Sequence, residues 1–367
     1  GCDARPRWAV AAPRVAEVLM LDATLDRIRE AHADGTPLVI RGGGSKAFYG
    51  NAGTGEPLDT RALAGVVDYQ PKELVLSARA GTPLAEIEAL LAGQGQMLAF
   101  EPPRFGGPAT LGGCIASGLS GPRRPYAGSV RDFVLGVRLI DGTGQALRFG
   151  GQVIKNVAGY DVSRLMVGAL GTLGFLTEVS LKVLPRPAAE TTLQFELDEA
   201  AALLKMNQWA GQPLPLSATS WHAGLLTLRL SGAASAVHAA QARLGGEPLN
   251  DDAAFWQRLR DQATPFFDKR PLWRLAVKSS TPPFNLADAQ WIEWGGAVRW
   301  LASNLPPAAL REAARKGGGH ATLFRGNAPV DSAFTPLAPA LLTLHRNLKQ
   351  RFDPKGIFNR GRLYPDF

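Results

Sequence analysis

The sequence predicts an α+β protein of two lobes whose C-terminal segment returns to the first lobe. First, a chain of 367 residues is too long for one ordinary hydrophobic core. Second, the run PRP at 185–187 ends a strand-like pattern, and seven of the eight tryptophans lie beyond it, between 209 and 300. Third, residues 337–367 hold one helical pattern and a tail too short for a domain. We therefore expect domains at 1–187 and 188–336, with 337–367 packing back on the first.

The first lobe opens with a helix and a strand. Apolar spacing predicts a helix over 21–34, whose inward face carries Leu21, Leu25 and Ile28. The strand-like PLVI at 37–40 follows it. The stretch ELVLSARAGTPLAEIEALLAGQG at 73–95 predicts a strand and then a helix, with Thr82 as the N-cap and Pro83 as the first helical residue.

A hairpin, a helix and a long strand complete the first lobe. VLGVRLIDGTGQALRF at 134–149 predicts a hairpin that turns at Asp141-Gly142. DVSRLMVGA at 161–169 has a helical pattern. FLTEVSLKVL at 175–184 alternates as a strand does, which puts Val179, Leu181 and Val183 on one face.

The second lobe has an α+β pattern. Strand-like LQFEL, a helix to about 210, LSATSW, LLTLRL and a helix to about 244 follow one another. Near the C-terminus, LAPALLTLHRNLKQRF at 337–352 predicts a helix that DPKG ends. Its apolar face would carry Leu341, Leu344, Leu348 and Phe352.

The composition is that of a globular enzyme. It is 46% hydrophobic and 20% charged, no run approaches the roughly eighteen apolar residues of a membrane span, and the first ten residues lack a signal-peptide core. We therefore expect a cytoplasmic location and no direct membrane span. The net charge of +8 favours anionic ligands or an acidic partner surface. The basic residues are scattered and not interleaved with aromatics, so we expect no nucleic-acid binding.

Cysteine and histidine usage limits the chemistry. Cys2 and Cys114 are the two cysteines, whereas an iron–sulfur cluster needs about four thiolates, so any such cluster belongs to another chain. The five histidines are dispersed and predict no metal site. His320, in KGGGHATLFRG, is the one candidate catalytic residue. The alternative is an ordinary exposed loop histidine.

Three glycine-rich stretches carry the strongest signal. They are RGGGSK at 41–46, FGGPATLGGCIASGLSG at 105–121 and GALGTLGFLTE at 168–178. Ordinary tight turns would explain any one of them. Three of them suggest that several backbone segments line one large ligand, which backbone N–H groups and the charges of Arg41 and Lys46 would hold as an anion.

The first glycine-rich stretch matches neither of two common nucleotide-binding motifs. GGGSKA at 42–47 fits G-x-G-x-x-A after a strand, but FYGNAGTGEPLD follows where a dinucleotide fold needs a helix. A Walker A loop is excluded because the chain contains no Gly-Lys dipeptide. The three arginines of GPRRPYAGSVRD at 121–132 leave three alternatives open, which are a solvated loop, an anion contact and a surface that docks a partner.

Four stretches together resemble a known family. They are RGGGSK, PATLGGCIASGLSGPRRPYAGSVRDFVLG, RFGGQVIKNVAGYDVSRLMVGALGTLGFLTEVSLKVLPRP and FDPKGIFNRGRLY. They resemble the PCMH-type FAD-binding fold of the vanillyl-alcohol-oxidase type and, more closely, the E subunits of bacterial glycolate oxidases. The resemblance extends through TPFFDKRPLWRL, IEWGGAVRWL and GGGHATLF. It implies an FAD-binding domain of two α/β subdomains, a smaller α+β cap domain and a C-terminal segment that returns to the flavin.

The resemblance also implies the cofactor contacts. The first loop, which would wrap the pyrophosphate, comprises Arg41, Gly42, Gly43, Gly44, Ser45 and Lys46. The second, beside the ribityl and phosphate region, contributes Thr110, Gly112, Gly113, Ser117 and Gly118. The third, toward the adenine, contributes Gly171, Thr172, Gly174, Phe175 and Leu176, and Asn359 matches a position near the isoalloxazine. Relatives that tether the flavin through the first loop have a histidine where this chain has Ser45, so the FAD should be non-covalent.

The activity implied is that of one subunit of a multi-subunit glycolate oxidase, which converts glycolate to glyoxylate and passes electrons to an acceptor. The implied partners are a catalytic flavoprotein subunit and an iron–sulfur subunit, through which the chain would reach the inner face of the membrane. Relatives that oxidise 2-hydroxy acids carry GEHG, whereas this chain has GGGHATLF. We therefore expect an electron-transfer or structural subunit that is inactive alone. The alternatives are a self-sufficient 2-hydroxy acid dehydrogenase or sugar-nucleotide reductase, and a non-catalytic scaffold.

Overall fold

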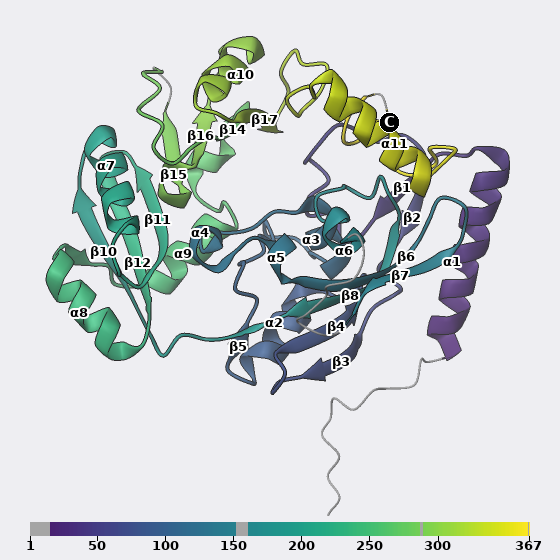
Figure 1. Cartoon of the computed structure of the whole chain (residues 1–367), viewed down its shortest axis with the longest axis horizontal. Helices are drawn as coiled ribbons and strands as arrows, with labels where there is room; N and C mark the ends of the chain where they lie inside the picture. The colour runs from purple at the N-terminus through teal and green to yellow at the C-terminus, as the bar shows by residue number, and fades with distance from the viewer. Residues whose placement is uncertain (1–14, 152–160, 287–288, 366) are drawn as a thin grey trace, which may run out of the picture.

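The computed structural model describes residues 15–151, 161–286, 289–365 and 367. These residues form two bodies, one at the right of Figure 1 and one at the left, and helix α11 lies over the first body. Cys2 lies outside the described residues, and so do positions 152–160, which belong to the family-like stretch that begins RFGGQVIKNVAGYD.

The first body is built on a five-stranded antiparallel sheet of order β3-β4-β8-β6-β7. Its strands are β3 (Val66–Gln70), β4 (Val75–Arg79), β8 (Phe175–Lys182), β6 (Val134–Ile140) and β7 (Ala146–Gly150). Two small pairs flank it, parallel β1 (Leu38–Arg41) with β2 (Glu56–Asp59), and antiparallel β5 (Gln96–Met97) with β9 (Leu184–Pro185). The helices are α1 (Val15–Asp34), α2 (Leu84–Ala92), α3 (Leu111–Ser117), α4 (Arg124–Ala127), α5 (Val130–Phe133) and α6 (Val162–Leu165).

Most of the predicted elements of this body are confirmed. In α1, Leu21, Leu25 and Ile28 pack against one apolar cluster, as expected, and the hairpin turns at Asp141-Gly142. The helix expected over 161–169 is one short turn, α6. The prediction that Thr82 caps α2 is wrong, because Pro83 occupies the N-cap position and no side chain caps the helix. The Thr82 hydroxyl bonds instead to the N–H and C=O of Gly65, which joins two turns.

Strand β8 lies in the middle of the sheet and is buried on both faces. Val179, Leu181 and Val183 are fully buried, as predicted. The opposite face does not reach solvent, because Glu178 pairs with Arg79 at 2.7 Å and Ser180 bonds to a serine of the neighbouring strand.

The second body is an eight-stranded antiparallel sheet of order β13-β10-β12-β11-β15-β16-β14-β17. The strands are β10 (Ala189–Glu196), β11 (Leu216–His222), β12 (Leu225–Gly232), β13 (Glu247–Pro248), β14 (Leu272–Ala276), β15 (Gln290–Glu293), β16 (Val298–Ala302) and β17 (His320–Arg325). The helices are α7 (Glu199–Ala210), α8 (Ala234–Leu244), α9 (Asp252–Arg260), η1 (Pro265–Asp268), η2 (Trp294–Gly296) and α10 (Pro307–Lys316). The chain leaves the sheets of the first body after β9 and joins this sheet at β10.

The C-terminal segment pairs with the first body. After α11 (Pro339–Phe352), the Leu38 N–H of β1 donates to the Ile357 carbonyl at 2.7 Å, and the Asn359 N–H donates to the Leu38 carbonyl at 2.9 Å. The predicted apolar face of α11 is wrong in its first half, because Leu341 and Leu344 are 49% and 53% exposed. Only the last turns of the helix rest on the body, through Phe352 and the buried Lys349.

No helix among the described residues has the length and apolar character needed to cross a bilayer.

Candidate functional site

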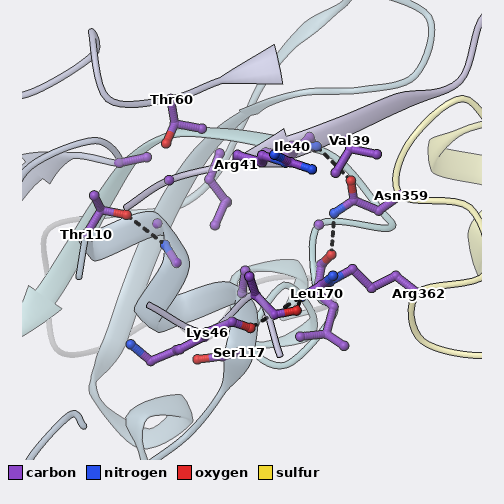
Figure 2. Close-up of a pocket in the computed structure, with 18 of the residues that line it drawn as sticks. Val39, Ile40, Arg41, Lys46, Thr60, Thr110, Ser117, Leu170, Asn359 and Arg362 are labelled. Atoms are coloured by element: carbon purple, nitrogen blue, oxygen red, sulfur yellow. Dashed lines mark hydrogen bonds between the residues drawn. The ribbon is translucent and has the colours of Figure 1, made fainter. Parts of the chain in front are cut away.

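A cavity of about 410 Å³ opens where the three glycine-rich stretches meet the C-terminal segment. Figure 2 shows side chains from β1, from α3, from the loop at Leu170 and from the tail at Asn359 and Arg362 around one space. The sequence separates these segments widely. The geometry therefore brings the three glycine-rich stretches together around one cavity.

The first loop offers a row of unused backbone donors to this cavity. Gly42, Gly43, Gly44, Ser45 and Lys46 all line it, and none of their five N–H groups has a hydrogen-bond partner among the described residues. The buried Thr60 hydroxyl, another lining group, also lacks a partner there. Buried polar groups are nearly always satisfied, so this loop is built for an acceptor that is not part of the chain.

The charge of the cavity is positive. Arg41, Lys46 and Arg362 line it, and no carboxylate does so among the described residues. Burial lowers the pKa of Lys46. Its ammonium lies 3.3 Å from the Ser45 hydroxyl and over the Phe105 ring. Arg362 donates to the carbonyls that close the first loop and was missed by our sequence reasoning, although it lies in the quoted FNRGRLY. The arrangement suits a ligand with two negative charges.

The glycines of the first loop have two different roles. A Cβ on Gly43 would lie 1.4 Å from the Pro108 carbonyl oxygen, so Gly43 lets the first and second stretches touch. Gly44 has φ +76 and open space where its Cβ would project. Gly43 therefore serves the packing of the two stretches, whereas Gly44 leaves space that a ligand can use. Gly42, Gly112 and Gly171 also meet protein atoms within 3 Å.

Asn359 closes the cavity with its side-chain amide. Its Oδ1 accepts the Ile40 N–H at 2.7 Å and its Nδ2 donates to the Leu170 carbonyl at 2.6 Å (Figure 2). Both amide groups are thereby used by the protein, and Asn359 is only 2% exposed. The residue joins β1 to the third glycine-rich stretch.

Most of the predicted contact residues line the cavity, and three do not. Those that do are Arg41, Gly42, Gly43, Gly44, Ser45, Lys46, Thr110, Gly112, Gly113, Ser117, Gly171, Gly174, Leu176 and Asn359. Thr172 bonds through its hydroxyl to the Ala169 carbonyl, and Phe175 packs in a core cluster behind the wall. Gly118 lines a neighbouring cavity.

This second cavity, of about 340 Å³, lies between the two bodies and shares Ser117 with the first. Aromatic rings of both bodies line it, together with Arg124, Arg274 and Glu293. Burial raises the pKa of Glu293 to about 7, although the Trp300 N–H and the charge of Arg274 act in the opposite direction. His320, the candidate catalytic residue, lies exposed at the start of β17 and lines neither of these two cavities.

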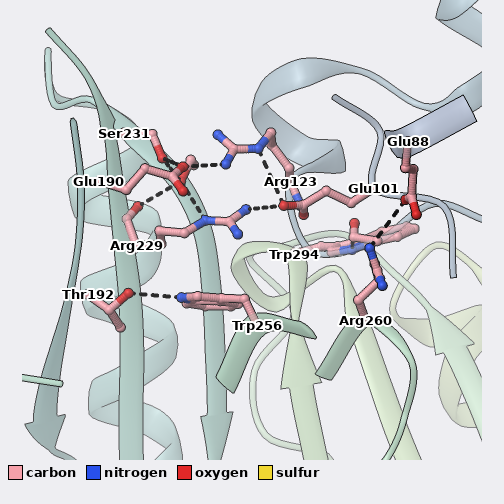
Figure 3. Close-up of polar contacts among 12 residues, drawn as sticks. Glu88, Glu101, Arg123, Glu190, Thr192, Arg229, Ser231, Trp256, Arg260 and Trp294 are labelled. Carbon is pink, nitrogen blue, oxygen red and sulfur yellow. Dashed lines mark hydrogen bonds and ion pairs between the residues drawn. The ribbon is translucent and has the colours of Figure 1, made fainter. Parts of the chain in front are cut away.

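Ion pairs hold the two bodies together beside the second cavity (Figure 3). Glu101 of the first body accepts the Arg123 N–H at 2.8 Å and lies 2.9 Å from the Arg229 guanidinium of the second. Arg123 in turn pairs with Glu190. Arg260 of the second body lies 3.4 Å from Glu88 of the first. These contacts fix the walls of the cavity relative to each other.

Comparison with known proteins agrees with the site. The model of a family described as FAD binding domain matches residues 15–150. The chain is 50% identical over 345 residues to glycolate oxidase subunit GlcE of Escherichia coli, a match that covers 94% of this chain and 97% of that protein. It is 31% identical over 210 residues to glycolate oxidase subunit GlcD of Bacillus subtilis, which covers 54% of this chain and 43% of the relative.

Solved structures support the fold. An alkyldihydroxyacetonephosphate synthase superposes with a TM-score of 0.62 at 17% identity, over 92% of this chain and 75% of that chain. The expected PCMH-type α+β fold and the expected FAD cofactor are confirmed. The free N–H groups, the three cations and the space beside Gly44 fit the diphosphate of that cofactor.

The two glycine roles predict different outcomes for Gly44→Val and Gly43→Val. Valine at a positive φ costs roughly 1–2 kcal/mol. At Gly44 its branches would enter the open space, so the folded protein should lose most of its FAD. At Gly43 they would meet the Pro108 carbonyl, so the melting temperature should fall sharply. FAD content and thermal melting measure the two effects.

Gly35→Val is the matched control, because Gly35 has φ +72, open space for a Cβ and a position outside the cavity. It should keep its FAD. Stoichiometric FAD in Gly44→Val would exclude the first loop as the diphosphate site.

The raised pKa of Glu293 predicts that the stability of the fold depends on pH. Its pKa is about 7 in the folded protein, against about 4.3 in an unfolded chain. Between these values the folded state holds a proton that the unfolded state has lost, so the free energy of unfolding should fall as pH rises from about 4.5 to about 7. Urea titrations of the wild type and Glu293→Gln across this range isolate the effect as their difference, up to roughly 3 kcal/mol. A difference that stays constant with pH would contradict the assignment.

Proposed function

The chain belongs to the family of the glycolate oxidase subunit GlcE, and we propose that it is an FAD-carrying subunit that relays electrons in, or structurally supports, a multi-subunit glycolate oxidase. The 50% identity across nearly the whole length of GlcE carries this proposal. When bound, FAD supplies a two-electron redox centre. The first loop, Lys46 and Arg362 would hold its diphosphate, and Asn359 would keep the walls of the site together.

Two further subunits would supply glycolate oxidation and an iron–sulfur cluster, which this chain does not provide. Its resemblance to GlcD suggests a second flavoprotein of the same fold as the subunit that oxidises glycolate to glyoxylate. An iron–sulfur cluster would belong to a further subunit, because the chain has two cysteines and burial raises the pKa of Cys114 to about 12. We place the complex at the cytoplasmic face of the membrane, which this chain would reach through its partners.

The cavity linings favour a role other than the oxidation of glycolate. Removing a hydride equivalent from a hydroxy acid needs a base near neutral pH and a group that stabilises the alkoxide. No histidine lines the cofactor cavity or the second cavity, and the described residues contain no group of three metal-ligating side chains. His320 lies on the exposed end of β17.

A second candidate function is a self-sufficient 2-hydroxy acid dehydrogenase. Glu293 favours it, because a carboxyl whose pKa is about 7 is suited to act as a general base and lies in the cavity next to the cofactor cavity. A scaffold that has lost its flavin is disfavoured, since the donors and cations of the first cavity are intact.

The flavin of the purified chain should be FAD and non-covalent. The match of residues 15–150 to a family described as FAD binding domain supports FAD over FMN, and the first loop has Ser45 where a tethering histidine would stand. Acid precipitation should leave the yellow colour in the supernatant, and chromatography should identify it as FAD. Colour retained in the pellet, or released FMN, would refute this assignment.

The isolated FAD-loaded chain should not oxidise glycolate at a useful rate. General acid–base catalysis alone contributes roughly 10²- to 10⁴-fold, and the chain places no histidine in either cavity to provide it. Anaerobic mixing with glycolate, followed at the visible flavin band, is the measurement. In the assembled complex, the visible flavin absorption should fall when glycolate is added. Rapid bleaching of the chain alone would favour the second candidate, and its loss in Glu293→Gln would identify the base.

A further inference from the structure

The turn at residues 104–108 packs against the first loop. Gly107 approaches Ser45 so closely that a Cβ on Gly107 would lie 2.9 Å from the Ser45 Cβ. The Lys46 ammonium lies over the Phe105 ring, 5.6 Å from its centre. Because the loop and the turn touch through both backbone and side chains, a shift of the turn would change where the free N–H groups of the loop point. The shape of the first loop therefore depends on this turn.

The turn is held in a strained conformation by a carboxylate of the second body. Phe105 has φ 53 and Gly106 has φ 71, and a bulky residue stays in this left-handed region only where its surroundings impose it. The Asp261 Oδ1 accepts the Arg104 N–H at 2.7 Å and the Phe105 N–H at 3.4 Å. One oxygen of the second body thus fixes two successive N–H groups of the first.

Asp261 lies directly after α9, at the end of the helix where a negative charge is unfavourable. Its side chain is only 14% exposed. Arg260 compensates for the charge, since its guanidinium donates to the Asp261 Oδ2 at 2.8 Å and lies 3.4 Å from Glu88 of the first body (Figure 3). The carboxylate therefore does not serve α9 itself, and its bonds to the first body account for its position.

We propose that Asp261 is a positioning residue for the cofactor, which holds the first loop, through the 104–108 turn, in the shape that binds the FAD diphosphate. The second body would thereby retain the cofactor without touching it, since none of its described residues lines the cofactor cavity. The inference rests on the first loop as the diphosphate site, which Gly44→Val tests by itself. It is independent of whether the flavin relays electrons.

The test measures the dissociation constant of FAD for the flavin-free full chain, together with the melting temperature of each variant. Asp261→Ala should weaken FAD binding about tenfold or more, because both N–H groups lose their acceptor. Asp252→Ala is the matched control, since Asp252 is a carboxylate of the same helix that accepts the Thr192 hydroxyl of its own body. Its FAD affinity should stay within about twofold of wild type.

Two further variants separate the position of the acceptor from its charge. Burial lowers the pKa of Lys46 and the charge of Asp261 acts in the opposite direction, so charge alone could also influence the cavity. Asp261→Asn keeps an acceptor oxygen in place and removes the charge. Asp261→Glu keeps the charge and moves the acceptor by one bond. Positioning predicts that Asp261→Asn binds FAD more tightly than Asp261→Glu, and this comparison decides if Asp261→Ala does not fold.

A double-mutant cycle tests the route of the effect. Phe105→Leu should weaken FAD binding too, and its effect should not add to that of Asp261→Ala, because both act through the same turn. Three results would overturn the proposal, namely wild-type affinity in Asp261→Ala, binding by Asp261→Asn that is no tighter than by Asp261→Glu, and additivity in the cycle. Stoichiometric FAD in Gly44→Val would instead remove the diphosphate site on which the inference rests.

Discussion

The cofactor cavity depends on one buried asparagine amide that holds together segments far apart in the chain. Asn359 satisfies the Ile40 N–H and the Leu170 carbonyl at once, so the strand before the first loop and the third glycine-rich stretch keep a fixed separation. Asn359 is itself positioned by Lys349 and Asp353. Lys349 donates to Asp353 and to the carbonyls of Thr172 and Phe358, while Asp353 accepts the N–H groups of Ile357 and Phe358. The buried charges are thus fully bonded, the condition under which burial is tolerated.

Residues with strained backbone occur at both cavities. Leu170 and Asn359 at the first cavity, and Phe105 and Trp294 at the second, have φ between 43 and 55. Each such residue costs of order 1–3 kcal/mol, so it persists only where surrounding contacts determine it. At Asn359 those contacts are the hydrogen bonds of its own amide. At Trp294 they are the hydrogen bond to the Gly121 carbonyl and the guanidiniums of Arg124 and Arg274 against its ring. Rigid walls follow, which is the property that a pre-formed ligand site requires.

The sequence predicts what is local and misses what depends on a distant contact. The glycine-rich stretches and most of their lining residues were found, because composition shows where backbone can approach a ligand. The packing role of Gly43 could not be predicted, because it depends on Pro108, which no local pattern connects to it. Likewise Leu341 has the spacing of a buried face, but the helix rests on the body only at its far end. Arg362 was missed because a lone arginine in a tail carries no periodicity, and its three carbonyl acceptors appear only in the fold.

Ion pairs between the bodies also hold the walls of the second cavity. Arg229 and Glu101 are both largely buried, and their charged groups lie 2.9 Å apart. A movement of the second body away from the first would break this contact. The Arg123–Glu190 and Arg260–Glu88 pairs oppose the same movement. The second cavity is therefore walled by segments that several ion pairs hold in place, which is the pre-formed geometry that a ligand site requires.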